Sequence, residues 1–326
     1  MSKVQKYLGL LLLVVCLVGC ASNPANNTAL ISERQERMFW EITSPTGTTV
    51  YVLGTIHVGT EEIANLPQGV LEAFDHSNHL YAELALADLQ NQQNYLTPLL
   101  QETTVVDEEG VPIPLTMLLD DSAAACLEQV IIASLGDQYT DEAFTSMACL
   151  PPWFWTNTLT LSVYQAMGYN AEQGIDVLLY NRGFVSGKEI LGLDSMETQL
   201  NILSFGTPEE QLALLQEMLH NITQEKLEEF EIVNQMVAAY LEDNRSEVER
   251  IVQQSIQDEM EAAGADYIKA YTDMVYTQRN RSWADQITTM LQQENETYFI
   301  FAGTAHWLAE DSVFNMLVQD GVARWQ

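Results

Sequence analysis

Short apolar runs at both ends of the chain have the pattern of β-strands. Residues 38–43 and 48–54 are rich in β-branched and aromatic side chains and flank a turn-forming tetrapeptide, Ser44-Pro45-Thr46-Gly47, which predicts a hairpin. Near the other end, residues 297–302 form an apolar run typical of a strand, and residues 322–325 indicate a further short one. We therefore expect a sheet that is built from both ends of the chain.

A β-α-β unit and two long helical stretches are predicted between these ends. Pro67 opens a helical pattern with apolar positions three and four residues apart, and residues 79–84 have the pattern of the next strand. Residues 87–180 and 207–293 are largely helical in pattern, and residues 188–193 indicate a short strand between them. The expected fold class is α/β (α+β), with a central sheet of N- and C-terminal strands and a large helical insertion.

The N-terminus has the layout of a secretory signal. Within residues 1–19, two lysines precede an apolar run at 8–18 that is too short for a comfortable membrane span. Leu17-Val18-Gly19-Cys20 resembles a bacterial lipobox, in which the cysteine is lipidated after cleavage; an ordinary cleaved signal peptide is the alternative. Residues 20–32 are mostly small and polar, so we expect them to act as a flexible tether before a domain at 33–326.

Composition limits the partners of the protein. The chain has 46 Asp and Glu against 13 Lys and Arg, a formal net charge of −33. Such a surface repels nucleic acid, which is bound through basic clusters, so nucleic acid is not an expected partner. A lipid on Cys20 would be the membrane anchor and would place the protein at the cell envelope, facing the periplasm or the outside. The sequence does not indicate an oligomeric state.

Two cysteines, Cys126 and Cys149, remain once Cys16 is removed with the signal and Cys20 carries the lipid. In an oxidising compartment two such thiols are expected to pair. Two free buried thiols are the alternative, because the sequence does not give the Cα separation that a bridge requires. The sequence therefore predicts a Cys126–Cys149 disulfide.

Two similar segments end in histidine and follow apolar strands: Val52-Leu53-Gly54-Thr55-Ile56-His57 and Phe301-Ala302-Gly303-Thr304-Ala305-His306. In open α/β sheets, ligands bind at the carboxyl ends of strands, where glycine lets the backbone turn sharply. Glu83 adds a carboxylate near the end of another apolar strand, where a buried and unpaired carboxylate would be costly.

Two imidazoles and one carboxylate are the minimum set that binds a divalent metal and leaves positions open for water. His57, Glu83 and His306 are therefore candidate metal ligands. The alternative is that backbone carbonyls satisfy both histidines and that Glu83 faces solvent on an edge strand. If the histidines bind a metal, its affinity is expected to fall with acidification around pH 6 to 7.

Several motifs, taken in order along the chain, resemble those of the TraB/GumN family. They are Gly54 to Gly59, Glu83-Leu84, Gly174-Ile175-Asp176, Gly192 to Gln199, Arg279-Asn280 and Gly303 to His306. The resemblance implies a fold shared with the Tiki metalloproteases and with erythromycin-esterase-like (EreA) and ChaN-like proteins. It also implies a peptidase centre at His57, Glu83 and His306 that holds a divalent ion such as Mn, Co or Zn, with Arg279 and Asn280 as a further polar pair.

The sequence departs from the family pattern at two positions. Asp194 stands where the family more often has Glu, which keeps a carboxylate. Trp307 replaces a small or aliphatic residue and is expected to narrow the entrance of the site.

The predicted function is a metal-dependent hydrolase, in the first place a peptidase, whose substrate is a peptide or protein at the cell envelope. A metal would activate water and polarise a carbonyl while a carboxylate moves the proton. Arg279 is a candidate to stabilise an oxyanion, and a surface salt bridge is the alternative reading of this residue. A non-catalytic module that binds or sequesters a peptide is the alternative function, because a fold can persist without its chemistry.

Overall fold

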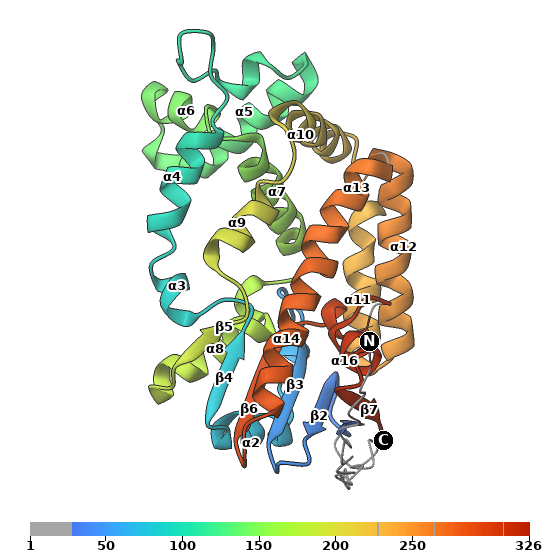
Figure 1. Cartoon of the computed structure of the whole chain (residues 1–326). Coiled ribbons are helices and arrows are strands. Elements are labelled where there is room, and N and C mark those ends of the chain that lie inside the picture. The colour runs from blue at the N-terminus through green and yellow to red at the C-terminus, as the bar shows by residue number, and fades with distance from the viewer. Residues whose placement is uncertain (1–27, 227, 264, 309) are drawn as a thin grey trace, which may run out of the picture.

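The two ends of the chain meet in one sheet (Figure 1). The structure is a computed structural model that describes residues 28–326 except 227, 264 and 309. Its sheet has seven strands in the order β5-β4-β6-β3-β2-β1-β7. They are β1 Ala29–Glu33, β2 Phe39–Thr43, β3 Thr49–Thr55, β4 His79–Ala82, β5 Ile190–Gly192, β6 Thr297–Gly303 and β7 Ala323–Trp325. The predicted α/β fold with a sheet of N- and C-terminal strands is confirmed.

The middle of the sheet is parallel, and this sets the position of the site. β6 lies between β3 and β4 and runs parallel to both. Its residues Tyr298 to Ala302 are all buried, as expected for a strand covered on both faces. The register between β3 and β6 pairs Gly54 with Ala302 and Thr55 with Gly303, so the two Gly-Thr-x-His segments leave the sheet side by side.

The helices around the sheet share its apolar core. Phe74 of α2, Leu179 of α8, Trp283 of α14 and Phe314 of α16 belong to the same buried cluster as Phe299 of β6. Complete burial of one such side chain contributes about 1.5 to 3 kcal/mol. These helices are α2 Gln68–His76, α8 Ile175–Ser186, α14 Arg279–Leu291 and α16 Val313–Gln319.

A second layer of helices lies above the sheet in Figure 1, beyond the carboxyl ends of β4 and β6. It has its own apolar cluster, to which Leu127, Trp155 and Leu215 belong. Helix α10 begins at a capping box, with Thr207 and Glu210 bonded reciprocally. The layer contains α3 Leu86–Gln90, α4 Gln93–Thr103, α5 Asp121–Leu135, α6 Asp141–Ala148, α7 Pro152–Ala166, α9 Met196–Leu203 and α10 Pro208–Thr223.

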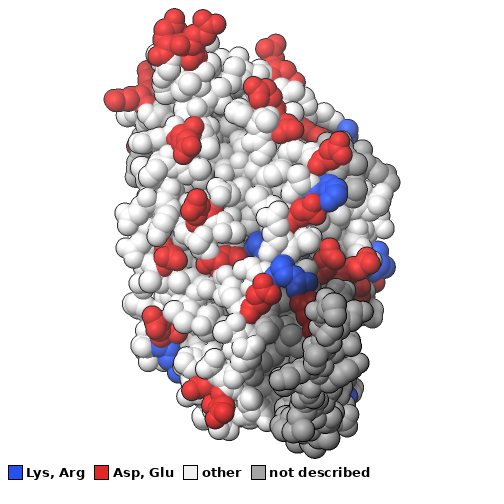
Figure 2. Space-filling view, viewed as in Figure 1, with Lys and Arg blue, Asp and Glu red and all other residues white. Residues whose placement is uncertain are grey.

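The other helices complete the chain path between these layers. They are α1 Glu61–Ala64, α11 Ile232–Leu241, α12 Arg245–Ala263, α13 Ala265–Thr272, the π-helix η6 Asp273–Gln278 and α15 Ala305–Leu308, with 3-10 turns at Leu115–Met117, Gly136–Gln138, Ala171–Gln173 and Glu228–Glu231. Within the described residues, we find no helix that is both long and apolar enough to cross a bilayer. Figure 2 shows acidic side chains scattered over both layers, with fewer basic ones among them.

The first strand corrects the predicted tether. β1 begins at Ala29, inside the segment 20–32 that composition assigned to a flexible tether. Ile31 is fully buried, and β1 pairs with β2 on one side and β7 on the other. A strand forms there because its inward side chains complete the sheet core. The predicted signal peptide, residues 1–19, and the lipobox Cys20 lie outside the described residues.

The predicted disulfide is not formed: Cys126 and Cys149 are both free thiols in the structure. Cys126, on α5, packs against the apolar cluster of the helical layer. Cys149, at the end of α6, lines a surface pocket with residues such as Leu100 and Thr145, and partial burial raises the pKa of its thiol.

Candidate functional site

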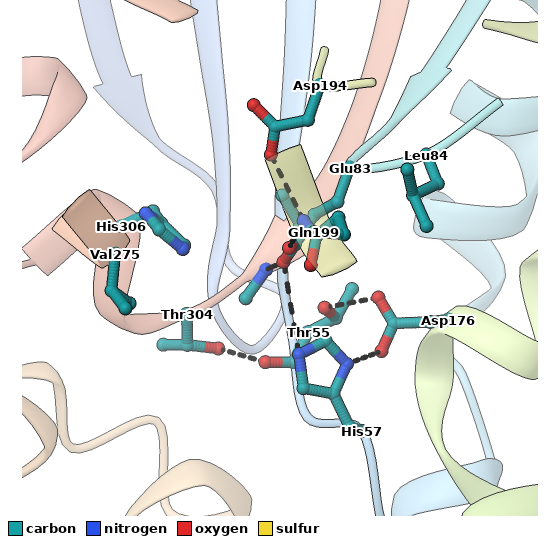
Figure 3. Close-up of polar contacts among 12 residues, drawn as sticks. Thr55, His57, Glu83, Leu84, Asp176, Asp194, Gln199, Val275, Thr304 and His306 are labelled. Carbon is teal, nitrogen blue, oxygen red and sulfur yellow. Dashed lines mark hydrogen bonds and ion pairs between the residues drawn. The ribbon is translucent and has the colours of Figure 1, made fainter. Parts of the chain in front are cut away.

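Three predicted ligands come together at the carboxyl edge of neighbouring strands. His57 follows β3, Glu83 directly follows β4, and His306 lies in α15 just after β6. Figure 3 shows the side chains of these three residues around one small space. A Cβ placed on Gly303 would lie 3.2 Å from Glu83 Oε1, 3.5 Å from His306 Cδ2 and 3.8 Å from His57 Nε2. Any side chain at position 303 would therefore fill the space that the three groups share.

The two Gly-Thr-x-His segments are tied to each other. The backbone N–H and the hydroxyl of Thr304 both donate to the carbonyl of Thr55, at 3.0 and 2.8 Å. Thr55 in turn donates its own hydroxyl to Asp176. The threonines of the two segments therefore fix the relative position of the loops that carry the histidines.

The protonation of His306 follows from its hydrogen bonds. Its Nδ1 lies 2.6 Å from Oδ1 of Asn280, whose Nδ2 donates to the carbonyl of Asp311 at 2.8 Å. The amide is thereby oriented, and Nδ1 of His306 must carry the proton. Burial, together with the nearby Arg279, lowers the pKa of His306 to about 3. His306 is thus neutral and presents a lone pair on Nε2.

Aromatic rings hold the same imidazole in place. The ring of His306 lies 4.4 Å from that of Trp283 and 5.3 Å from that of Tyr276, measured between centroids. Trp283 donates its indole N–H to Asp194 at 2.8 Å. His306 is only 5% exposed, so several neighbours determine its orientation.

His57 is held differently. Its Nδ1 lies 2.9 Å from Oδ2 of Asp176, and its Nε2 lies 3.9 Å from Oε1 of Glu83. The side chain is 68% exposed, so the site opens to solvent on this side. The Asp176 carboxylate raises the pKa of His57 against the effect of desolvation.

A glycine brings Asp176 to His57. A Cβ on Gly174 would lie 2.3 Å from the carbonyl oxygen of His57, which only glycine permits. The backbone of Ile175 donates to the carbonyl of Ile56 at 3.1 Å, and Asp176 stands in the first turn of α8. The Gly174-Ile175-Asp176 motif therefore places a carboxylate against the first histidine segment.

Glu83 and Arg279 form a buried ion pair. Arg279 donates from NH2 to Glu83 Oε2 at 2.5 Å, and Gly303 N–H donates to Glu83 Oε1 at 2.8 Å. Burial alone would raise the pKa of Glu83, but the cationic charges near it and the Gly303 hydrogen bond lower it overall. Glu83 is therefore ionised, and Oε1 is the oxygen that faces His57.

Arg279 is fixed by further contacts. Its Nε donates to Asp194 Oδ2 at 2.7 Å, and its NH1 lies 3.2 Å from the carbonyl of Val275 and 3.3 Å from Nε2 of His306. Arg279 is only 5% exposed. The alternative of a surface salt bridge is wrong, because this guanidinium lies inside the site.

Three further site residues lie in the family-like motifs, but the sequence predicted no chemical role for them: Asp176, Asp194 and Gln199. Gln199 donates to Glu83 Oε2 and to Asp194 Oδ2, both at 3.1 Å. Asp194 follows β5, the strand next to β4, so the rule that located Glu83 at a strand end applied to it as well. The positions of Asp176 and Gln199 depend on how α8 and α9 pack, which the strand pattern does not give.

Trp307 does not narrow the entrance of the site. It is 1% exposed, belongs to the core cluster, and donates its indole N–H to the carbonyl of Ala302. Its ring packs against Phe314 and Trp283. The large side chain is accommodated in the core behind the site.

The side chains around this space include the nitrogen and oxygen donors that a divalent cation binds. Nε2 of His57 and Oε1 of Glu83 face the space at Gly303, and His306 presents its Nε2 lone pair to Arg279 beside it. With His57 neutral, Glu83, Asp176 and Asp194 against Arg279 leave a formal charge of −2, which one divalent cation neutralises.

His57 and Glu83 lie farther apart than two ligands of one metal ion. Within the described residues, no group of three His, Cys, Asp or Glu side chains is already arranged to hold a metal ion. His57 Nε2 and Glu83 Oε1 are 3.9 Å apart, whereas two tetrahedral ligands of one cation stand about 3.3 Å apart. The residues suit a divalent cation in type, but His57 and Glu83 would have to approach each other by about half an ångström and Nε2 of His306 would have to give up its contact with Arg279.

The protein is thus an α/β protein in which two histidine segments lie side by side at the carboxyl edge of a mixed sheet, beneath a layer of helices (Figure 1). The model of the TraB/PrgY/gumN family matches residues 20–323, so the chain belongs to this family. It is 27% identical over 315 residues to an uncharacterized protein of Treponema pallidum (strain Nichols), which covers 95% of this chain and 89% of that protein.

A second relative is the uncharacterized protein YbaP of Escherichia coli (strain K12). It is 23% identical over 282 residues, which is 85% of this chain and 90% of that protein. No solved structure matches the chain significantly.

Proposed function

We propose that the protein is a metal-dependent hydrolase, in the first place a peptidase like the Tiki enzymes, that acts on a peptide or protein at the cell envelope. A lipid on Cys20 would anchor it. The observation that carries the proposal is the hydrogen bonding of the two histidines. Each engages Nδ1 with an acceptor, Asp176 or Asn280, which leaves the Nε2 of His57 toward Glu83 and the Nε2 of His306 toward Arg279. Metal-binding histidines are oriented in this way.

A divalent cation such as Mn, Co or Zn, held by His57, Glu83 and His306, would supply Lewis acidity and lower the pKa of a bound water. Oε1 of Glu83 faces the same space and is the oxygen placed to bind the cation or to accept a proton. Oε2 is occupied by Arg279 and Gln199, which fixes the rotation of the carboxylate.

Arg279 acts in this proposal as a support rather than as a free donor to substrate. Its Nε, NH1 and NH2 all donate within the protein. Its positive charge beside Glu83 keeps that carboxylate ionised at neutral pH. The role of oxyanion stabiliser would require it to give up one of these bonds.

The test is metal analysis of the purified protein beside His57→Ala and His306→Ala. Either substitution should remove most of the bound metal and the hydrolysis of a peptide library. A thermal melt separates this loss from unfolding, which matters most for His306 because it is buried. His79→Ala is the matched control, since His79 pairs with Glu296 and lies at the opposite, amino end of β4. Full metal occupancy in both site variants would reject the shared site.

A non-catalytic module that binds or sequesters a peptide is the second candidate. One observation favours it: Arg279 already neutralises Glu83 and donates to Nε2 of His306, so the buried polar groups are satisfied within the chain itself. A protein that retains no divalent ion, yet binds peptide equally before and after chelation, would support this alternative over the hydrolase.

A further inference from the structure

The two histidines of the site are held to very different degrees. His306 contacts Asn280, Arg279, Tyr276 and Trp283 and is buried. Within the described part of the chain, the His57 ring has one hydrogen-bond partner, Asp176, and is largely exposed. An exposed side chain without a partner samples several rotamers, and ordering it costs free energy. The orientation of His57 therefore depends on a single hydrogen bond, beside its longer ion-pair contact with Glu83.

Asp176 is itself well fixed. It is 9% exposed, and its other oxygen, Oδ1, accepts the hydroxyl of Thr55 at 2.7 Å. Thr55 ends β3, and Asp176 stands in the first turn of α8, where a carboxylate also suits the helix dipole. The carboxylate thus connects two rigid elements and leaves Oδ2 for His57.

We propose that Asp176 is a positioning residue, which holds the His57 ring by its Nδ1–H so that Nε2 points to Glu83 and Gly303. Its effect on cation binding rests on the proposed function, whereas its effect on the ring does not. Removing the Asp176 acceptor should leave His57 present but misplaced, and cation affinity should fall about 10- to 100-fold, the usual effect of losing such a partner.

The isosteric change Asp176→Asn is the sharpest variant. The carboxylate accepts two hydrogen bonds, one from Thr55 and one from His57. A neutral amide is a weaker acceptor than a carboxylate, and its single oxygen reaches His57 only if its NH₂ group turns to Thr55, whose hydroxyl must then accept instead of donate. Asn280 is the informative contrast, because its NH₂ group has an acceptor of its own, the carbonyl of Asp311.

The experiment compares wild type, Asp176→Asn and Asp176→Glu by proton NMR of the His57 Nδ1–H and by calorimetric titration with Zn²⁺ alone. Glu172→Gln is the matched control, because it removes an exposed carboxylate four residues before Asp176 that has no recorded contact with the ring. In wild type we expect a slowly exchanging, downfield Nδ1 proton. Asp176→Asn should lose it together with Zn²⁺ affinity, Asp176→Glu should recover part of both, and Glu172→Gln should change neither.

A thermal melt of each variant separates misplacement from unfolding. If Asp176→Asn keeps both the Nδ1 proton resonance and the wild-type Zn²⁺ affinity, the inference is overturned. If wild type binds no Zn²⁺, the proposed function fails, but the resonance still decides whether Asp176 positions the ring. A loss of the resonance in Glu172→Gln as well would also count against a specific contact with Asp176.

Discussion

At the scale of single residues, Arg279 determines the charge balance of the site. It is the cation bonded to both Glu83 and Asp194, and all three side chains are largely buried. Removing one partner of a buried ion pair leaves an uncompensated charge in a medium that solvates it poorly. The arginine is therefore needed for folding as well as for the geometry of Glu83.

We predict that Arg279→Gln lowers the free energy of unfolding by about 3 kcal/mol, because Glu83 and Asp194 lose their counter-charge. Arg281→Gln on the same helix is the control: Arg281 pairs with Asp320 at the surface, and such pairs contribute about 1 kcal/mol or less. Urea denaturation of both variants measures the difference. Equal losses of unfolding free energy in the two variants would show that the buried ion pairs of Arg279 stabilise the fold no more than the surface pair of Arg281.

The two histidines also differ in their response to pH. Asp176 raises the pKa of His57 above 6.5, whereas burial lowers the pKa of His306 to about 3. The His57–Asp176 contact contributes stability that is fully present below pH 6.5 and is lost as pH rises through the raised pKa. Because water screens this exposed pair, we expect that contribution to be small.

A cation that binds both histidines must displace a proton only from His57. We predict that its apparent affinity rises about tenfold per pH unit up to the raised pKa of His57, about 10, and levels off above it. This window is higher than the pH 6 to 7 range of unperturbed histidines. Calorimetric titration with Zn²⁺ in two buffers of different ionisation heat should give about one proton released per cation; a release of none or of two contradicts the assignment.

The sequence made His57, Glu83 and His306 candidates because each follows an apolar strand, and parallel strands place their carboxyl ends at one edge of a sheet. It did not give the tautomer of His306, which depends on the carbonyl of Asp311. Nor did it give the role of Asp176, which depends on the approach of a helix. Contacts between a loop and a helix far along the chain leave no periodic signal, so these roles needed the structure.

At the scale of elements, the helix that carries Arg279 contains an irregularity that the pattern did not reveal. The six residues of η6, Asp273–Gln278, are π-helical and lead directly into α14. Such turns are rare and occur often at functional sites. The carbonyl of Val275 in this turn accepts from Arg279, and the ring of Tyr276 lies against His306. The irregular turn thus contributes two contacts to the site.

The start of α8 is the element whose placement matters most for His57. We predict that Gly174→Ala displaces this helix end, because the added Cβ would lie 2.3 Å from the carbonyl oxygen of His57. The melting temperature should fall, and Zn²⁺ affinity should fall with it as Asp176 moves away. Calorimetry and a thermal melt measure both. An unchanged melting temperature with unchanged Zn²⁺ affinity would mean that the contact between the helix and the loop is not tight.

At the scale of the whole molecule, the fold class followed from the arrangement of strands and helices along the sequence. Strand-forming ends and a helical middle gave the sheet and the insertion, and both were confirmed. The start of the sheet was missed because Ala29 to Glu33 is short and follows a segment of small and polar residues. Its assignment as a strand depends on pairing with β2 and β7, and β7 comes from the far end of the chain.

If Cys20 carries a lipid, the strand at Ala29 limits the distance between the sheet and the membrane. Nine residue steps join Cys20 to Ala29, which span at most about 30 Å when extended. A lipid on Cys20 would therefore hold the amino edge of the sheet, where Ala29 lies, close to the bilayer, whereas the candidate site lies at the opposite, carboxyl edge.

We predict that Cys20→Ser abolishes acylation and leaves an unprocessed precursor, because the lipid is attached through that sulfur. Partitioning into detergent and intact-mass analysis of the purified protein measure the effect. Cys16→Ser is the matched control, since Cys16 lies in the apolar run that is removed with the signal; it should leave processing and acyl mass unchanged. Acyl mass retained on the Cys20→Ser chain would show that the lipobox assignment is wrong, and the protein would then reach the envelope by an ordinary cleaved signal peptide.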